Sequence, residues 1–176
     1  KAIATLLRDH VQSELAGEAC RRLAYGFRNE NEAFLRAVLA SNPHRDARGL
    51  ASLRLAQFLN ARQQRLELLQ ERPAMAQRYA GLFGEEYLAA IRRKDPGEVL
   101  QEVEKLFEQA AEKYADVKVL YGGTVGEKAK SELYEIRHLT IGKTAPDLEG
   151  DDQEGRHFKL SDYRGKVVLL YFWSEY

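Results

Sequence analysis

The spacing of apolar residues predicts helices almost throughout residues 1 to about 138. The clearest of them is a helix that begins at Asp95 and Pro96. The Asp95 carboxylate can accept hydrogen bonds from the first free amides, Pro96 suits the first helical position, and Glu98 completes a capping box. The apolar residues that follow recur at helical spacing and so share one face: Val99, Val103, Leu106, Ala110 and Tyr114.

Two further helical segments are predicted before this one. The first ends at Pro73, and the second runs to the cations of residues 92–94, which suit a helix C-terminus. Gly81 and Gly84 interrupt the second segment and weaken its pattern. The residues that define the two segments are Leu55, Phe58, Leu59, Leu66 and Leu69, and then Met75, Tyr79, Phe83, Tyr87 and Ile91.

Two portions of the helical region have a similar pattern. Residues 34–59 and 107–136 each predict a helix, a polar turn and a second helix in which a small residue stands four positions before a large one. These pairs are Ala51 with Leu55 and Ala129 with Leu133. The pattern resembles the helical hairpins of tetratricopeptide-type arrays, whose helices approach closely. An ordinary helical bundle explains the same pattern.

The pattern changes near residues 140–143, where glycine and proline become frequent and β-type segments replace helical ones. We therefore predict a helical domain over residues 1–140 and a second domain over residues 141–176. The second domain is expected to open with a hairpin at residues 144–161. Gly165 is expected to take a positive φ in the turn that follows.

Residues 167–173 form an unbroken apolar run. Apolar residues without alternation are typical of a strand covered on both faces, as in the parallel sheets of α/β proteins. A strand of this kind needs neighbouring strands and covering helices, and few residues follow it. We therefore expect the chain to end inside a domain.

The charge of the chain is balanced, with 27 Lys and Arg against 27 Asp and Glu. This balance argues against a general nucleic-acid binder, which would have a basic excess. No apolar stretch approaches the ~20 residues of a membrane-spanning helix. Two local clusters of charge are interpreted as solvated helix faces: Arg45, Arg48, Arg54, Arg62 and Arg65, and Glu98, Glu102, Glu104, Glu108 and Glu112.

Few residues of the chain suggest catalysis. Cys20 is the single cysteine, and its neighbours Ala16, Ala19 and Leu23 predict a buried, inert thiol. No G-x-S-x-G motif is present. The histidines show no ligand spacing, so we expect no metal site, no cofactor and no catalytic group within the chain: His10, His44, His138 and His157.

Residues 122–128 are glycine-rich and precede a predicted helix, which gives them a faint similarity to a phosphate-binding loop. The spacing between the glycines is too short for that signature, and Glu127 stands between Gly126 and Lys128. The carboxylate of Glu127 would repel a phosphate. We therefore predict a connecting loop between helices.

Residues 141–173 resemble the opening of the redoxin domains of the thioredoxin superfamily, which include peroxiredoxins and TlpA-like thiol-disulfide oxidoreductases. The resemblance depends on A-P-D at 145–147, F-K-L-S-D-Y-R-G-K at 158–166 and V-V-L-L-Y-F-W at 167–173, and it covers about a fifth of the chain. It implies a mainly α protein, with a helical domain that is tetratricopeptide-like or a bundle. The first β elements of a truncated thioredoxin-like α/β domain follow.

The resemblance also implies where the active site lies. In the family a Cys-x-x-Cys motif follows the strand, so Trp173 and Tyr176 would flank redox cysteines located after Tyr176. This chain is then an inactive part of a disulfide reductase or a peroxidase, which acts on a protein disulfide or a peroxide. The helical domain would position a protein partner, and the resemblance suggests an extracytoplasmic bacterial location.

A second hypothesis places the chain in another class. It is a helical-repeat interaction module with a β tail that pairs with a partner, because an open apolar strand edge recruits other strands. Cysteines in the codons after Tyr176 would favour the redox protein. A stop codon would favour the interaction module.

Overall fold

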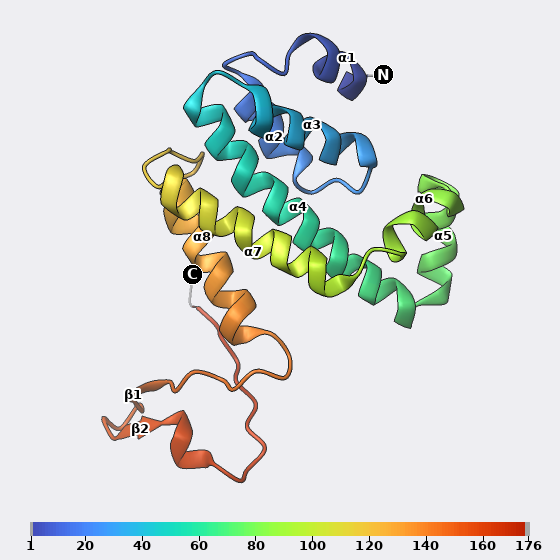
Figure 1. Ribbon diagram of the computed structural model, residues 1–176. Coiled ribbons are helices and arrows are strands. Elements are labelled where there is room, and N and C mark those ends of the chain that lie inside the picture. Colours follow the sequence, from blue (N-terminus) through green and yellow to red (C-terminus); the bar gives the residue numbers. More distant parts are fainter. Residues whose placement is uncertain (1, 175–176) are drawn as a thin grey trace. The chain divides into compact units, whose positions relative to one another are not determined.

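The computed structural model describes residues 2–174 of a mainly α protein (Figure 1). The chain forms two compact units, Lys1–Leu133 and Tyr134–Tyr176. The division between them falls near the end of a helix, a little before the boundary expected at residue 140. The predicted fold class is confirmed, since helices are followed by a small two-stranded sheet.

The first unit consists of helices. α4 is the longest of those described and packs against α2, α3, α5 and α7. Short connections join most neighbouring helices. The helices are α1 (Ala2–Asp9), α2 (Ala16–Leu23), α3 (Asn29–Ser41), α4 (Arg45–Glu71), α5 (Pro73–Phe83), α6 (Glu85–Arg92), α7 (Pro96–Lys113) and α8 (Val125–Tyr134).

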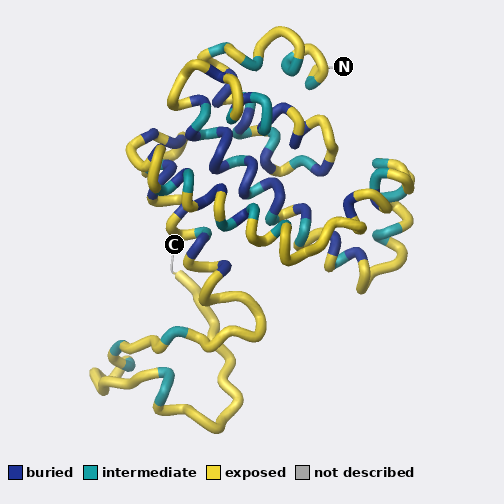
Figure 2. Tube along the Cα trace, in the orientation of Figure 1, coloured by how far each residue is buried: buried dark blue, intermediate teal, exposed yellow. Residues whose placement is uncertain are grey.

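The core of this unit lies around α4, whose Phe58 is fully buried (Figure 2). Phe34 of α3 and Phe107 of α7 are also fully buried. The apolar face predicted for α7 is confirmed, because Val103, Leu106 and Ala110 are buried. Removal of these side chains from water is the main source of stability for the helical unit.

The N-cap and the first position of α7 are as predicted, whereas the return bond from the Glu98 side chain to the Asp95 amide, which a capping box needs, is not among the hydrogen bonds of the described residues. Asp95 is the N-cap and its Oδ1 accepts a hydrogen bond from the Glu98 amide at 2.9 Å, while Pro96 occupies the first helical position. The end of α4 is also as predicted, since that helix stops at Glu71, before Pro73. Local chemistry fixes both boundaries.

The segment predicted to run from Pro73 to the cations at 92–94 is instead two helices, α5 and α6. The chain breaks at Gly84, which has φ 91°, a left-handed conformation that glycine adopts without strain. The prediction of one continuous segment was therefore wrong at this residue.

The two similar portions of the sequence each form two successive helices, α3 with α4 and α7 with α8, here called the first and the second hairpin; in the first, α3 packs against α4. The small–large pairs point into the core, since Ala51, Leu55, Ala129 and Leu133 are all buried. Close backbone approach accounts for a small residue in the second hairpin, because a Cβ at Gly126 would lie 2.8 Å from the Cα of Ala115. A tetratricopeptide-like arrangement of these hairpins remains a prediction.

The second unit continues α8 into a π-helical turn, Glu135–Leu139, and then becomes extended. β1 (Glu149–Asp151) and β2 (His157–Lys159) form the expected antiparallel hairpin, with Gly150 opposite Phe158. A 3-10 turn, Leu160–Tyr163, follows. Gly165 has φ 82°, as predicted.

The strand predicted at residues 167–173 is not formed. These residues pair with no strand among those described, and β1 and β2 pair only with each other. The physical reason is that a strand is defined by its neighbours: an apolar run supplies the side chains of a buried strand but not its hydrogen-bond partners.

Candidate functional site

The C-terminal motifs that carry the family resemblance are joined by hydrogen bonds. Oδ1 of Asp147 accepts from the Ser161 amide at 2.8 Å, and Oδ2 accepts from the Ser161 hydroxyl at 2.7 Å. The Ser161 hydroxyl, and then its amide, hold the pKa of Asp147 below the usual value for a carboxyl. The A-P-D motif is therefore pinned to the turn that follows β2.

A second pair of contacts fixes the same turn. The Lys159 amide donates to Oδ2 of Asp162 at 2.8 Å, and the Leu160 amide donates to the Leu148 carbonyl at 2.8 Å. Asp162 thus caps the 3-10 turn, and the Leu148 bond extends the hairpin beyond its paired strands. These contacts give the aspartate of each motif, Asp147 and Asp162, a structural role in the turn.

The apolar run after this turn is exposed. Val167 has a relative exposure of 104% and Leu169 of 91%. Trp173, one of the two residues predicted to flank a redox site, is 70% exposed and lies outside any helix or strand. Tyr176, the other, lies outside the described residues. The role of both as flanking residues remains a prediction.

Charged side chains gather on the hairpin. Nδ1 of His157 lies 3.0 Å from a carboxylate oxygen of Asp151, and Nζ of Lys159 lies 2.7 Å from one of Glu149. The pairs connect the two strands and are exposed, so each contributes little to stability. Within residues 2–174 no group of three or more His, Cys, Asp or Glu side chains could hold a metal ion.

Cys20 is fully buried in α2. Burial raises the pKa of its thiol to about 12, since the thiolate would lose its hydration. At neutral pH the side chain is a protonated thiol that a disulfide cannot reach. The predicted burial of Cys20 is confirmed. A buried, protonated thiol is a weak nucleophile, and the inertness of Cys20 stays a prediction.

A buried ion pair joins α3 to α4 and was missed by the sequence reasoning. Arg62 is 4% exposed, and its Nη1 lies 2.5 Å from Oε2 of Glu32. Arg36 donates to Oε1 of Glu32 at 2.7 Å and to Glu102 of α7 at 2.6 Å. The prediction that the arginine cluster is a solvated face was therefore wrong for Arg62. The available signal was its place between the core positions Leu59 and Leu66.

Glu32 is ionised in this network. Burial alone would raise its pKa, but the charges and hydrogen bonds of Arg62 and Arg36 outweigh burial and hold the pKa of Glu32 below its usual value. Arg62, Arg36 and Lys94 pair with Glu32, and Arg36 also pairs with Glu102, so the network links α3, α4 and α7 and is partly exposed at its Arg36–Glu102 end. It is a structural clamp, without a free acid or base for catalysis.

The glycine-rich segment before α8 connects two helices, as predicted, and its last residues also cap α8, which was not predicted. The Thr124 amide donates to Oε2 of Glu127 at 2.7 Å, and the Glu127 amide donates to the Thr124 hydroxyl at 3.2 Å. This reciprocal pair is a capping box. The Glu127 carboxylate therefore already takes the Thr124 amide, one of the donors that a phosphate at this helix start would use.

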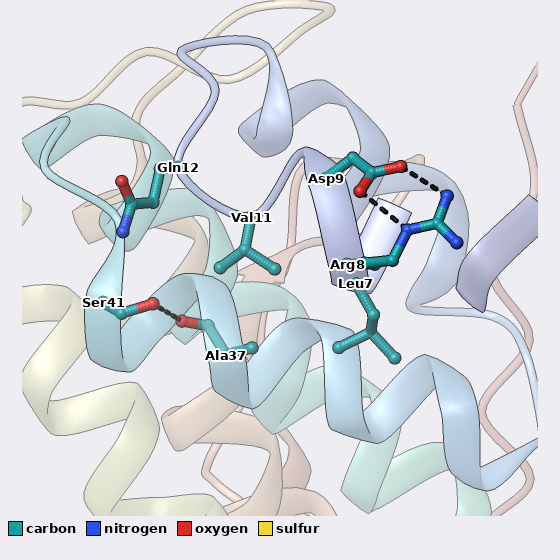
Figure 3. A pocket seen from close by; sticks show the side chains of 7 residues that line it. All are labelled: Leu7, Arg8, Asp9, Val11, Gln12, Ala37 and Ser41. Carbon is teal, nitrogen blue, oxygen red and sulfur yellow. Dashed lines mark hydrogen bonds and ion pairs between the residues drawn. The ribbon is translucent and has the colours of Figure 1, made fainter. Parts of the chain in front are cut away.

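A hollow of about 450 Å³ lies between α1 and α3 (Figure 3). Three of its polar side chains have partners within the hollow: Arg8 and Asp9 form a two-pronged pair at 2.8 and 2.7 Å, and the Ser41 hydroxyl donates to the Ala37 carbonyl; Gln12, which is uncharged, also lines it. The remaining lining is largely Leu7 and Val11. The hollow thus offers neither a nucleophile nor an unpaired charge to a substrate.

The comparisons with known proteins place the chain's relatives at its C-terminus. The AhpC/TSA family matches residues 141–176. Thiol-disulfide oxidoreductase ResA of Geobacillus thermodenitrificans is 53% identical over 36 residues, which are 20% of this chain and 21% of that protein. Peroxiredoxin Bcp of Bacillus subtilis is 51% identical over 37 residues, which are 21% of this chain and 24% of that protein.

A ResA protein of Geobacillus kaustophilus is similar over the same extent, with 50% identity over 36 residues. The chain thus spans between a fifth and a quarter of the length of the curated relatives it matches. No solved structure matches it. Over this short C-terminal region the relationship is to redoxin, thioredoxin-like proteins, as the motifs predicted.

A helix that crosses a bilayer must be both long and apolar. None of the helices within residues 2–174 combines the length and the apolar content needed to cross a bilayer.

Proposed function

We propose that this chain is a part of a thioredoxin-like thiol-disulfide oxidoreductase or peroxiredoxin-like protein, in which a helical domain positions the partner. The observation that carries the proposal is the match of residues 141–176 to the AhpC/TSA family. The single cysteine of the chain is buried and protonated, so the redox cysteines belong to sequence beyond residues 1–176. The chain by itself is then inactive.

The chemistry follows from the proposed position of the first cysteine. A cysteine at the N-terminus of the helix after Trp173 and Tyr176 would be favoured as thiolate by the amide dipoles. The thiolate attacks one sulfur of a substrate disulfide and the other sulfur leaves as a thiolate. A second cysteine then displaces the substrate, which is released fully reduced while the protein becomes a disulfide.

A peroxidase begins with the same thiolate but transfers electrons to a peroxide. The thiolate attacks one peroxide oxygen, the O–O bond breaks, and the cysteine becomes a sulfenic acid; the other oxygen leaves as hydroxide or alkoxide and takes up a proton to give water or an alcohol. The matched region is common to a relative named as an oxidoreductase and one named as a peroxiredoxin, so both substrates, a protein disulfide and a peroxide, stay within the proposal. The proposal also includes an extracytoplasmic location in a bacterium.

The test compares this chain with the full product of its source gene. Residues 1–176 should neither reduce a protein disulfide nor consume peroxide, and Cys20→Ser should leave that result unchanged. The full product should do one or the other, and should lose it when a cysteine after Tyr176 is replaced by serine. Turnover by residues 1–176 that disappears in Cys20→Ser would contradict the proposal.

A second candidate is an interaction module whose tail pairs with a partner strand. The exposure of Val167, Leu169 and Trp173 favours it, because open apolar segments recruit strands. A source gene that stops after Tyr176 would support this module. In that case residues 167–173 should become protected from hydrogen exchange on addition of the partner.

A further inference from the structure

α5 carries an apolar stripe that the helical unit covers only in part. None of its residues is buried, although it lies in the same unit as the fully buried positions of α4 (Figure 2). Leu82 is 56% exposed. The stripe borders a shallow hollow of about 340 Å³ lined by Met75, Arg78, Tyr79, Leu82 and Phe83. The spacing of these residues places them on one face of the helix.

The aromatic rings of this stripe rest on a fixed support. Phe27 is buried, and its ring centroid lies 5.2 Å from that of Tyr79 and 5.0 Å from that of Phe83. The Tyr87 hydroxyl of α6 donates to the Phe27 carbonyl at 2.5 Å. The stripe is therefore held in place before any partner arrives, which lowers the entropic cost of binding.

Guanidinium groups surround the stripe. Arg28 lies over the Phe83 ring at 5.4 Å, and Arg65 lies over the Tyr79 ring at 5.9 Å and donates to its hydroxyl at 2.9 Å. Arg78 lines the hollow itself. Among the described residues none of these three arginines forms an ion pair, in contrast to Arg36, which pairs with two carboxylates. α5 contains no acidic residue.

We propose that the α5 face, defined as Met75, Arg78, Tyr79, Leu82 and Phe83 with Arg28 and Arg65, docks an amphipathic helix of a partner protein that carries carboxylates beside its apolar stripe. Charge complementarity selects this occupant, because unpaired guanidinium groups at an apolar rim favour carboxylates in planar, two-pronged contacts. Tyrosine and arginine are also the residues that most often dominate binding energy at interfaces.

The size of α5 sets the size of the docked segment. Its 11 residues span about 16 Å at the α-helical rise, so about three turns of a partner helix would lie against it. A lipid surface is disfavoured, since a helix with the single cation Arg78 and rings already packed on Phe27 has little to insert. The inference deepens the proposed partner-positioning role and rests on it.

The experiment measures binding of synthetic peptides to residues 1–176. The acidic probe is a fluorescein-labelled 18-residue peptide with leucines at helical spacing and glutamates on both sides of them. The basic comparison peptide has lysine in place of every glutamate. We expect the acidic peptide to bind at least about tenfold more tightly than the basic one. Arg78→Glu and Leu82→Ser should each weaken it about tenfold.

Matched variants on other surfaces serve as controls. Arg93→Glu makes the same charge change as Arg78→Glu, and Leu100→Ser truncates a leucine of α7 that is also exposed. Both should bind the acidic peptide as the original chain does. Circular dichroism checks that all four variants remain folded.

Four results would overturn the docking proposal: equal affinity for the two peptides, no binding of the acidic peptide at millimolar concentration, binding of anionic vesicles that Leu82→Ser abolishes, or self-association that Leu82→Ser abolishes. The assay contains no redox step. A chain that binds the acidic peptide while its full gene product has no redox activity would refute the proposed oxidoreductase and leave the α5 face intact.

Discussion

The helical unit and the C-terminal unit differ in what holds them. In the helical unit, large apolar side chains from three helices, Phe34, Phe58 and Phe107, are fully buried. In the C-terminal unit, no described residue after Ile136 is buried, and its contacts are hydrogen bonds of a hairpin and a turn. The family resemblance lies in the second unit.

This difference separates two kinds of information in a sequence. Turns and caps need only the residues beside them. The two hydrogen bonds that Asp147 accepts from Ser161, called the Asp147–Ser161 latch below, therefore form without a packed core around them. Burial needs surfaces supplied by distant parts of a chain. A short motif can therefore identify a family while its apolar residues remain in water.

The largest expected effect tests that difference directly. Phe58→Ala should lower the free energy of unfolding of the helical unit by about 4 kcal/mol, because it leaves a cavity in a fully packed site. Phe172→Ala removes the same ring from an exposed position and should cost less than about 0.5 kcal/mol. Urea denaturation followed by circular dichroism measures both. Equal losses would show that the apolar run is packed in solution.

The buried ion pair should give the next largest effect. Glu32→Gln leaves the Arg62 guanidinium buried without its counter-charge, and we expect a loss of about 3 kcal/mol in the free energy of unfolding. Glu102→Gln, at the more exposed end of the same network, should cost less than about 1 kcal/mol. The same urea titration applies. A loss at Glu102 as large as that at Glu32 would contradict the assignment of the buried pair as the clamp.

The pH dependence of this clamp has a definite sign. The folded-state pKa of Glu32 is lower than the ordinary glutamate value of 4.5, so its ionisation stabilises the fold above that pH. This stabilisation is lost as pH falls below 4.5 through the folded-state pKa. The Glu32→Gln variant should therefore lose less stability on acidification than the original chain does.

The helix boundaries show what could be predicted from sequence. Asp95 and Pro73 act within a few residues of themselves, so the start of α7 and the end of α4 were predictable. The break at Gly84 was harder, because glycine permits a left-handed φ but does not require one. The charge of Arg62 indicated solvent, and only its pairing with Glu32, 30 residues away in sequence, explains its burial.

The candidate site was predictable to a similar extent. The motifs at 145–147 and 158–166 predicted the hairpin, the turn and the family relationship, because their aspartates and glycines act locally. The strand at 167–173 was not realised, since strand pairing depends on residues elsewhere. The unpaired arginines around α5 had no sequence signal, because they come from three separate segments.

A smaller effect is expected at the start of α7. Asp95→Ala removes the acceptor of the Glu98 amide and should lower the free energy of unfolding by about 1 kcal/mol. Asp95→Ser, which restores a capping oxygen, should recover most of that loss. Thermal or urea unfolding resolves the difference. A full loss in the serine variant would show that the charge of Asp95, rather than its hydrogen bond, stabilises the helix.

The smallest effect lies in the C-terminal latch. Asp147→Ala removes the oxygens that accept from Ser161, so the Ser161 amide should exchange with solvent faster while unfolding of the helical unit stays unchanged. The amide of Arg156, which donates to Asp152 at the other end of the hairpin, is the internal control and should keep its protection.

Acid should reproduce this substitution. The folded-state pKa of Asp147 is below the ordinary aspartate value of 3.8. The carboxylate therefore accepts both hydrogen bonds above that pH and gives them up as pH falls through the lower folded-state value. Amide chemical shifts across an acid titration should therefore move at Ser161 before the α7 amides change. If the Ser161 and α7 amides moved at the same pH, the hydrogen bonds of Asp147 to Ser161 would depend on the helical core. The two units would then not be stabilised independently.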